Sequence, residues 1–90
     1  MERHLTRYWI ELDFPDGYPP HATRLGIGVT AFDRDDALRL VAERVFQPGE
    51  LPHVREVRED VDVSTLDPGH VIPNMAPPNR RGIWFPLGYD

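Results

Sequence analysis

Carboxylates that could bind a cation lie in the second half of the chain. Asp60 and Asp62 are separated by one residue, so both side chains share one face if this segment is a strand. Such a pair suits a magnesium-type cation when a third oxygen ligand comes from elsewhere. The alternative is a solvated acidic face whose charge is partly offset by Arg55 and Arg58.

A second group combines a carboxylate, an imidazole and an amide: Asp67, His70 and Asn74. A carboxylate that orients a histidine is typical of general-base catalysis. The only serine, Ser64, is expected to cap a turn, so hydrolysis is the weaker interpretation. The stronger one is that these side chains satisfy backbone groups of a loop. We expect neither a bound metal nor an organic cofactor.

Residues 26–31 match the G-x-G-x-x-A form of a dinucleotide-binding fingerprint. In that motif the glycines form the turn after a strand, whereas here they lie within a predicted strand. Aspartates also crowd the start of the helix that follows, where they would repel a phosphate. Dinucleotide binding is therefore rejected.

Composition narrows the class of partner. The chain has 15 acidic and 10 basic residues, and its net charge of −5 disfavours binding to the phosphate backbone of nucleic acids. A basic protein is the favoured partner. The absence of cysteine excludes disulfides, thiolate metal sites and a cysteine nucleophile. No apolar run approaches the length of a membrane span, so we expect a cytoplasmic protein that does not bind membranes.

Apolar residues at alternate positions, the period of a half-buried strand, recur along the chain. The third such segment also fits a helical spacing, and its β-branched valines favour a strand. Strands are therefore predicted over residues 5–14, 25–32, 53–63 and 81–87.

Asp33 is predicted to cap a helix that runs to about Phe46. The order of elements predicts a single α+β domain over residues 1–90, with one helix on one face of a mainly antiparallel sheet of about four strands. Residues 64–80 form a proline-rich loop within this domain. We expect this loop to be pinned to the core, because it also carries apolar side chains.

Side chains alternate between the two faces of a strand. If the apolar residues of the first strand face the helix, Trp9 lies on the opposite face of the sheet, and Trp84 is expected on that face as well. Two interpretations of this face remain open. An exposed tryptophan patch rimmed by Arg80 and Arg81 has the composition of a protein-binding hot spot. Alternatively, the loop over residues 66–79 folds across the tryptophans and closes the face.

Several stretches of the sequence resemble a family of small conserved bacterial proteins with no established activity. They are residues 7–14, 28–33 with 36–38, 60–68, 70–75 and 81–86. The resemblance spans most of the chain and transfers no catalytic or binding residue. Small acidic bacterial proteins of this kind include immunity proteins that neutralise toxins, so the resemblance suggests an immunity-like role by analogy.

We therefore predict a non-enzymatic interaction module, immunity-like or accessory, that binds a basic protein partner. Its predicted contact residues are Trp9, Trp84, Arg80, Arg81, Asp60 and Asp62. The alternative is a small metal- or ligand-binding domain or enzyme that uses Asp60, Asp62, Asp67 and His70. Nucleic-acid binding is the weakest candidate, and a homodimer formed through an edge strand stays open.

Overall fold

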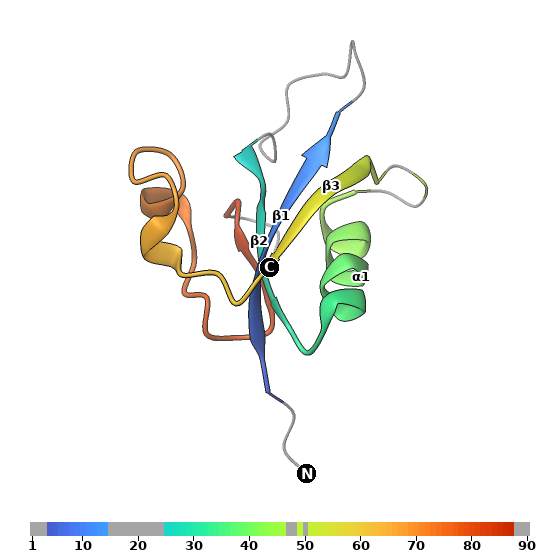
Figure 1. Cartoon of the computed structure of the whole chain (residues 1–90), viewed down its shortest axis with the longest axis horizontal. Helices are drawn as coiled ribbons and strands as arrows, with labels where there is room; N and C mark the ends of the chain where they lie inside the picture. The colour runs from blue at the N-terminus through green and yellow to red at the C-terminus, as the bar shows by residue number, and fades with distance from the viewer. Residues whose placement is uncertain (1–3, 15–24, 47–48, 50, 88–90) are drawn as a thin grey trace.

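A computed structural model describes residues 4–14, 25–46, 49 and 51–87. Within these ranges the chain forms four strands, one α-helix and two short 3₁₀ turns (Figure 1). The α+β class predicted from the sequence is confirmed. The elements are β1 (Thr6–Asp13), β2 (Ile27–Ala31), α1 (Arg34–Arg44), β3 (His53–Glu59), η2 (Val63–Thr65), η3 (Ile72–Asn74) and β4 (Gly82–Phe85).

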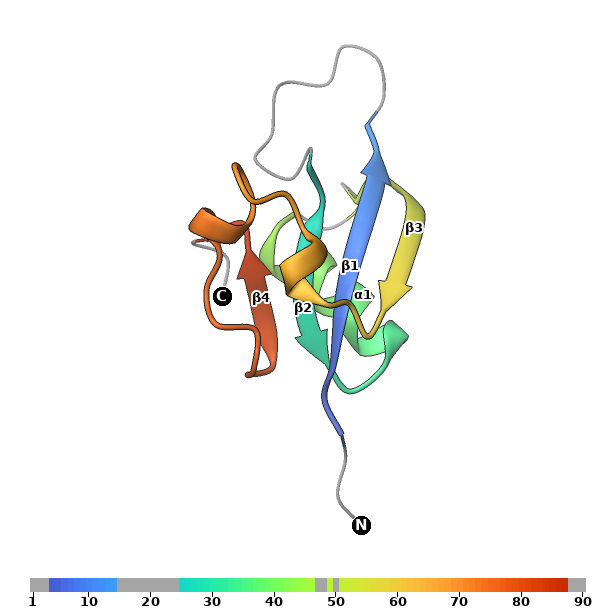
Figure 2. The same ribbon diagram turned by 60° about the vertical axis from the view of Figure 1, so that its left-hand side comes forward.

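The strands form one antiparallel sheet in the order β3-β1-β2-β4, which Figure 2 shows nearly face on. β1 lies in the interior and pairs with both neighbours, so that Tyr8 is opposite Val29 on one side and Glu59 on the other. A register shift between β2 and β4 leaves Trp84 as an extra residue. Trp84 and Phe85 therefore both reach the face opposite the helix, where simple alternation would have separated them.

The third strand is four residues shorter than the prediction over 53–63, because the chain leaves the sheet after Glu59. Asp60 has a φ of 54°, in the left-handed region, and this turns the backbone. Val61 then donates its backbone N–H to the Arg7 carbonyl at 3.1 Å and is buried away from β3. The expectation that Asp60 and Asp62 share a strand face is therefore wrong.

The helix begins as the sequence predicts. Asp33 is the N-cap, and its carboxylate accepts the backbone N–H of Asp36 at 2.8 Å. The helix ends at Arg44, slightly before the predicted end at Phe46. Its buried side includes Leu40 and Val41 and packs on one face of the sheet (Figure 1). Among the described residues, no helix has the length and apolarity needed to cross a membrane.

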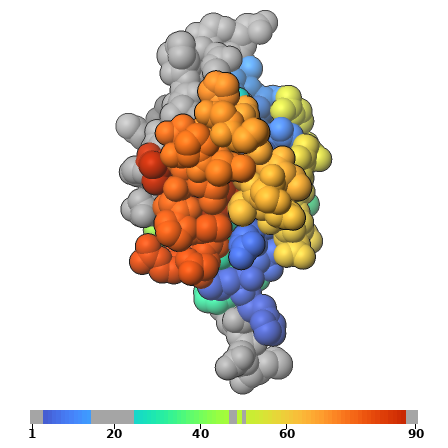
Figure 3. Space-filling view, turned by 90° about the vertical axis from the view of Figure 1, so that its left-hand side faces the viewer, coloured from blue at the N-terminus to red at the C-terminus, as the bar shows by residue number. Residues whose placement is uncertain are grey.

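The sheet has an apolar core on each face. The core under α1, here called the helix core, is mainly aliphatic and includes Ile10, Ile27, Val29 and Leu40. The opposite face is covered by residues 60–79, here called the cap, which Figure 3 shows as the yellow and orange surface. The core beneath it, the cap core, consists of Trp9, Val61, Leu66, Val71, Trp84 and Phe85.

Candidate functional site

Both tryptophans point away from the helix, as predicted, but they are not exposed. Trp9 is 4% and Trp84 is 1% solvent-exposed, and their ring centroids lie 6.1 Å apart. The structure therefore has the second of the two predicted arrangements, in which the loop closes the face. Closure is favoured because Leu66 and Val71 bury apolar surface against the indoles. Trp9 and Trp84 are thus core residues and not a ready-made contact patch.

Two glycines of the second strand region let the indoles approach the backbone. A Cβ atom at Gly26 would lie 2.5 Å from Trp9 Cζ2, and one at Gly28 would overlap the Trp84 ring. Gly26 also has a φ of 130°, which favours glycine. The Trp84 indole N–H is buried and has no hydrogen-bond partner among the described residues. Packing, rather than polar contact, therefore fixes the Trp84 ring.

The cap is tied to the sheet by hydrogen bonds as well as by its apolar side chains. The Thr30 hydroxyl donates to the Pro78 carbonyl at 2.6 Å. The Ala76 backbone N–H donates to the Trp84 carbonyl at 2.8 Å, beside β4. These bonds hold the proline-rich segment at the same edge at which β4 lies. The cap is consequently an ordered layer built without a long helix or strand.

The structure brings Asp67, His70 and Asn74 together within one turn system of the cap. Asp67 accepts the backbone N–H of Gly69 at 2.8 Å, and its other oxygen lies 3.1 Å from His70 Nδ1. The Asn74 amide donates to the His70 carbonyl at 2.9 Å. The Gly69 N–H, followed by the His70 side chain, lowers the pKa of Asp67 below its usual value. These groups therefore stabilise the loop backbone, as the stronger sequence interpretation holds.

Asp62 is occupied by the turn that follows it. It accepts both the backbone N–H of Ser64, at 3.0 Å, and the Ser64 hydroxyl, at 2.7 Å. The Ser64 hydroxyl lowers the pKa of Asp62 most, with a smaller contribution from Arg7. Because Ser64 donates to Asp62, its hydroxyl is not positioned on His70 as a nucleophile would be. In the described ranges, no group of three or more histidines and carboxylates could hold a metal ion.

The arginines expected to offset Asp60 and Asp62 point elsewhere. Arg55 lies 3.7 Å from Glu11 and 3.6 Å from Asp13, on the exposed part of the sheet. Arg58 lies 3.9 Å from Glu11 and 3.5 Å from Glu56. Three of these ion pairs join β1 to β3 and the Arg58–Glu56 pair lies within β3, so none of them involves an acidic residue of the cap.

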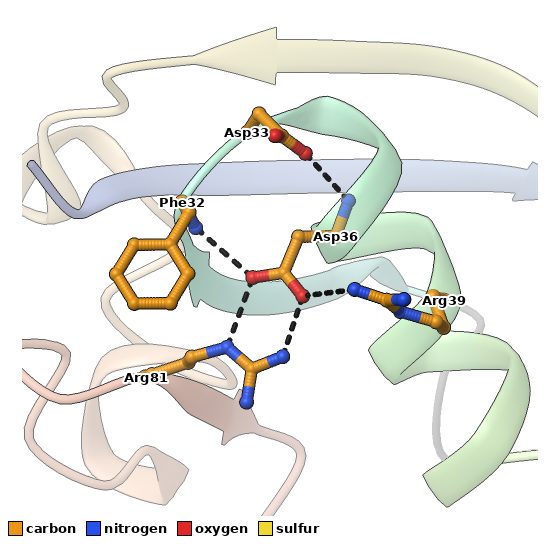
Figure 4. Close-up of polar contacts among 5 residues, drawn as sticks. All are labelled: Phe32, Asp33, Asp36, Arg39 and Arg81. Atoms are coloured by element: carbon orange, nitrogen blue, oxygen red, sulfur yellow. Dashed lines mark hydrogen bonds and ion pairs between the residues drawn. The ribbon is translucent and has the colours of Figure 1, made fainter. Parts of the chain in front are cut away.

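Sequence reasoning missed a buried carboxylate, Asp36, which is 4% exposed (Figure 4). Its oxygens accept the Phe32 backbone N–H at 3.1 Å and the Arg39 guanidinium at 3.1 Å. Arg81 donates to both oxygens, with Nε at 2.9 Å from Oδ2 and Nη2 on Oδ1. Arg81 holds the pKa of Asp36 far below its usual range, although burial acts in the opposite direction.

Arg81 therefore anchors the segment that leads into β4 to α1, and it is not a free rim residue of a tryptophan patch. Its guanidinium also lies 5.5 Å from the centroid of the Phe32 ring. The Asp-x-x-Asp spacing of Asp33 and Asp36 at a helix start could have indicated a reciprocal cap. No local pattern could have shown that the partner of Asp36 is 45 residues away.

Two hollows flank Arg81. One, of about 410 Å³, is lined by side chains that include Asp33, Asp35 and Arg39. The other, of about 210 Å³, is lined by residues that include Arg44, Arg80 and Trp84. Arg80, the other predicted rim residue, is exposed and belongs to this second hollow.

Comparison of the chain with family models, with curated proteins and with solved structures finds no match.

Proposed function

We propose that the protein is a non-enzymatic interaction module that binds a basic protein partner through the acidic surface of the cap. The observation that carries this proposal is the charge of the cap. Residues 60–79 contain three exposed carboxylates, Asp60, Asp62 and Asp67, and no arginine or lysine. Glu59, also exposed, precedes them directly. A positively charged surface would be attracted to this face and aligned on it.

The acidic groups are held in a fixed arrangement. Asp62 and Asp67 each accept hydrogen bonds from the turn that follows them, and Asp60 occupies the left-handed bend. The chain between them is anchored by the buried Leu66. A surface that is already ordered loses less conformational entropy when a partner binds.

The cap also offers an apolar contact among its charges. Ile72 is 38% exposed, and Met75 beside the cap core is half-buried. An apolar centre surrounded by charged groups is typical of protein interfaces. In this proposal the tryptophans contribute indirectly, because they support the cap from below. An immunity-like or an accessory role would each use such a surface.

The test is affinity capture with the full-length protein as bait in an extract of its source cells, followed by a binding titration with the purified partner. We expect one basic protein at a stoichiometric amount. Glu59→Gln combined with Asp60→Asn should weaken the purified complex by about tenfold, as expected for the loss of complementary charges. Asparagine suits position 60 because it tolerates the left-handed conformation.

The matched control is the pair Asp35→Asn and Glu43→Gln, which removes the same charge from the exposed side of α1. It should leave the affinity unchanged. Recovery of no basic protein, or equal weakening by both pairs of substitutions, would contradict binding through the cap. The complex should also weaken as salt is added, since exposed charges are screened.

The second candidate is a small metal- or ligand-binding domain or enzyme that uses Asp60, Asp62, Asp67 and His70. The exposed Asp67–His70 pair, at 3.1 Å, is the observation that favours it. Thermal unfolding in the presence of divalent cations tests this candidate, because a cation bound only by the folded protein raises the melting temperature. An unchanged melting temperature across the cation series would remove metal binding.

A further inference from the structure

The smaller hollow beside Arg81 is lined by three guanidinium groups. Arg44 reaches it from the end of α1, and Arg80 and Arg81 lie directly before β4. Ala76, Pro77 and Gly82 are among the other lining residues, and none of the described residues that line the hollow is acidic. The hollow has a volume of about 210 Å³, which accommodates a small oxyanion. Its local charge is thus opposite to the net charge of the chain.

Arg81 is fixed before any ligand arrives. Asp36 takes the Nε and Nη2 hydrogens of Arg81, and the Phe32 ring lies against its guanidinium. The Nη1 hydrogens of Arg81 are not used by Asp36. A donor that is already held in place loses little rotamer entropy when it binds an anion.

Arg44 and Arg80 supply the uncompensated charge. Within the described residues neither has a carboxylate at ion-pair distance, whereas Arg55 and Arg58 each reach two. Arg44 lies close over Gly82, where a Cβ atom would be 3.6 Å from Arg44 Nη1. Asp36 is paired with Arg81, and the exposed Glu43 offsets part of the remaining charge because it also acts electrostatically on Arg81. The guanidinium groups of Arg44 and Arg80 still leave a net positive charge around the hollow, which a dianion would balance.

We propose that this hollow binds an oxyanion of the phosphate class through Arg44, Arg80 and Arg81. Guanidinium groups match the tetrahedral oxygens of phosphate in geometry as well as in charge. Ala76 and Pro77 of the cap line part of the hollow, but the three arginines that would bind the anion lie outside the cap. Substitution of these arginines therefore tests the oxyanion site separately from the proposed protein interaction.

The experiment is a calorimetric titration of the full-length protein with inorganic phosphate at mildly alkaline pH and constant ionic strength. We expect saturable binding, together with a change in tryptophan fluorescence because Trp84 lines the hollow. Arg80→Gln and Arg44→Gln should each weaken binding by about tenfold, as expected for the loss of one charge-assisted hydrogen bond. Thermal unfolding of the unliganded variants should match the parent protein, since both side chains are exposed.

Arg55→Gln and Arg58→Gln remove the same charge from β3 and serve as matched controls. If they weaken binding as much as Arg80→Gln does, or if phosphate does not saturate the protein, the proposal is overturned. A second titration uses acetate, which carries a single negative charge. If acetate binds as tightly as phosphate, the hollow is not a site for dianions. A phosphoserine peptide is the third arm: tighter binding than inorganic phosphate assigns the oxyanion to a phosphorylated protein, and equal binding assigns it to free phosphate.

Discussion

The two faces of the sheet are covered in different ways. On one face the 11-residue helix α1 satisfies its own backbone hydrogen bonds and presents an apolar side to aliphatic residues of β1 and β2. On the other face the cap has only two three-residue 3₁₀ turns, and side chains such as Asp62, Asp67 and Asn74 satisfy its backbone. Large aromatic rings fill the space beneath it.

This difference implies different local stabilities. Helical structure is cooperative along the segment, so α1 should open only when the helix core is disrupted. The cap is held by separate contacts, each of which can be removed without removing the others. We therefore expect the cap to exchange its amide hydrogens faster than β1, β2 and α1 do.

The largest effect is expected for a truncation in the helix core. Ile10, in the interior strand, is completely buried. Ile10→Ala should lower the free energy of unfolding by about 4 kcal/mol, because it removes buried methyl groups and leaves a cavity. Urea denaturation measures this value, and hydrogen exchange should accelerate in α1 and in the cap together. Acceleration in the cap alone would contradict a shared dependence on this core.

Leu66→Ala tests the cap core in the same way. Leu66 is 7% exposed and packs under the cap, so its truncation should cost about 3 kcal/mol or less. Hydrogen exchange should accelerate in residues 60–79 and stay nearly unchanged in α1. If both faces lose protection equally, the cap and the helix core form a single cooperative unit.

The two faces of the sheet also differ in how much of their structure could be predicted from the sequence. The helix and the paired strands follow from apolar spacing and from Asp33, since these signals are local. The direction of Trp9 follows from the same alternation. Whether Trp9 is exposed depends on where a distant segment without periodicity folds, and this left two interpretations open. The β4 bulge and the pairing of Asp36 with Arg81 are likewise set by tertiary contacts that no local pattern records.

Asp36 links the two sides of the sheet, because its contact with Arg81 connects α1 to the segment that leads from the cap into β4. Asp36→Asn should lower the free energy of unfolding by about 2 to 3 kcal/mol near neutral pH, since it breaks a buried charged contact with Arg81. Arg39→Gln is a suitable control, because Arg39 is 64% exposed and its loss should have a small effect.

The same carboxylate predicts a dependence on pH. In the folded protein the pKa of Asp36 lies below its ordinary value of 3.8. The ionised carboxylate therefore contributes to the free energy of unfolding above about pH 5, and this contribution is lost as the pH falls toward the folded pKa. Urea denaturation across this pH range should show that the free energy of unfolding falls more steeply with decreasing pH for the parent protein than for Asp36→Asn. Asp62 and Asp67, whose pKa values are also lowered, keep some acid dependence in the variant. Equal slopes would show that Asp36 is not paired in solution.

Gly28→Ala tests how closely the cap core approaches the sheet. The added Cβ would overlap the Trp84 ring, so the ring must shift to make room for it. This shift should lower the free energy of unfolding by about 2 kcal/mol. The matched control is Gly69→Ala in the cap, where the nearest atom, Asp67 Oδ1, would lie 3.4 Å away. Thermal unfolding should show a clear decrease only for Gly28→Ala. Near-ultraviolet circular dichroism should change with it, because the two indoles lose their packing.

Thr30→Val should have the smallest effect, because it removes one polar tie and leaves the apolar contacts in place. Thr30 is 2% exposed, and its hydroxyl donates to the Pro78 carbonyl at 2.6 Å. Valine has nearly the same shape, so the expected loss is about 1 kcal/mol, the net value of one hydrogen bond. Hydrogen exchange should accelerate near Ala76, whose N–H bonds to Trp84, while protection around Leu66 persists. If the whole cap loses protection, polar ties rather than buried apolar side chains hold it on the sheet.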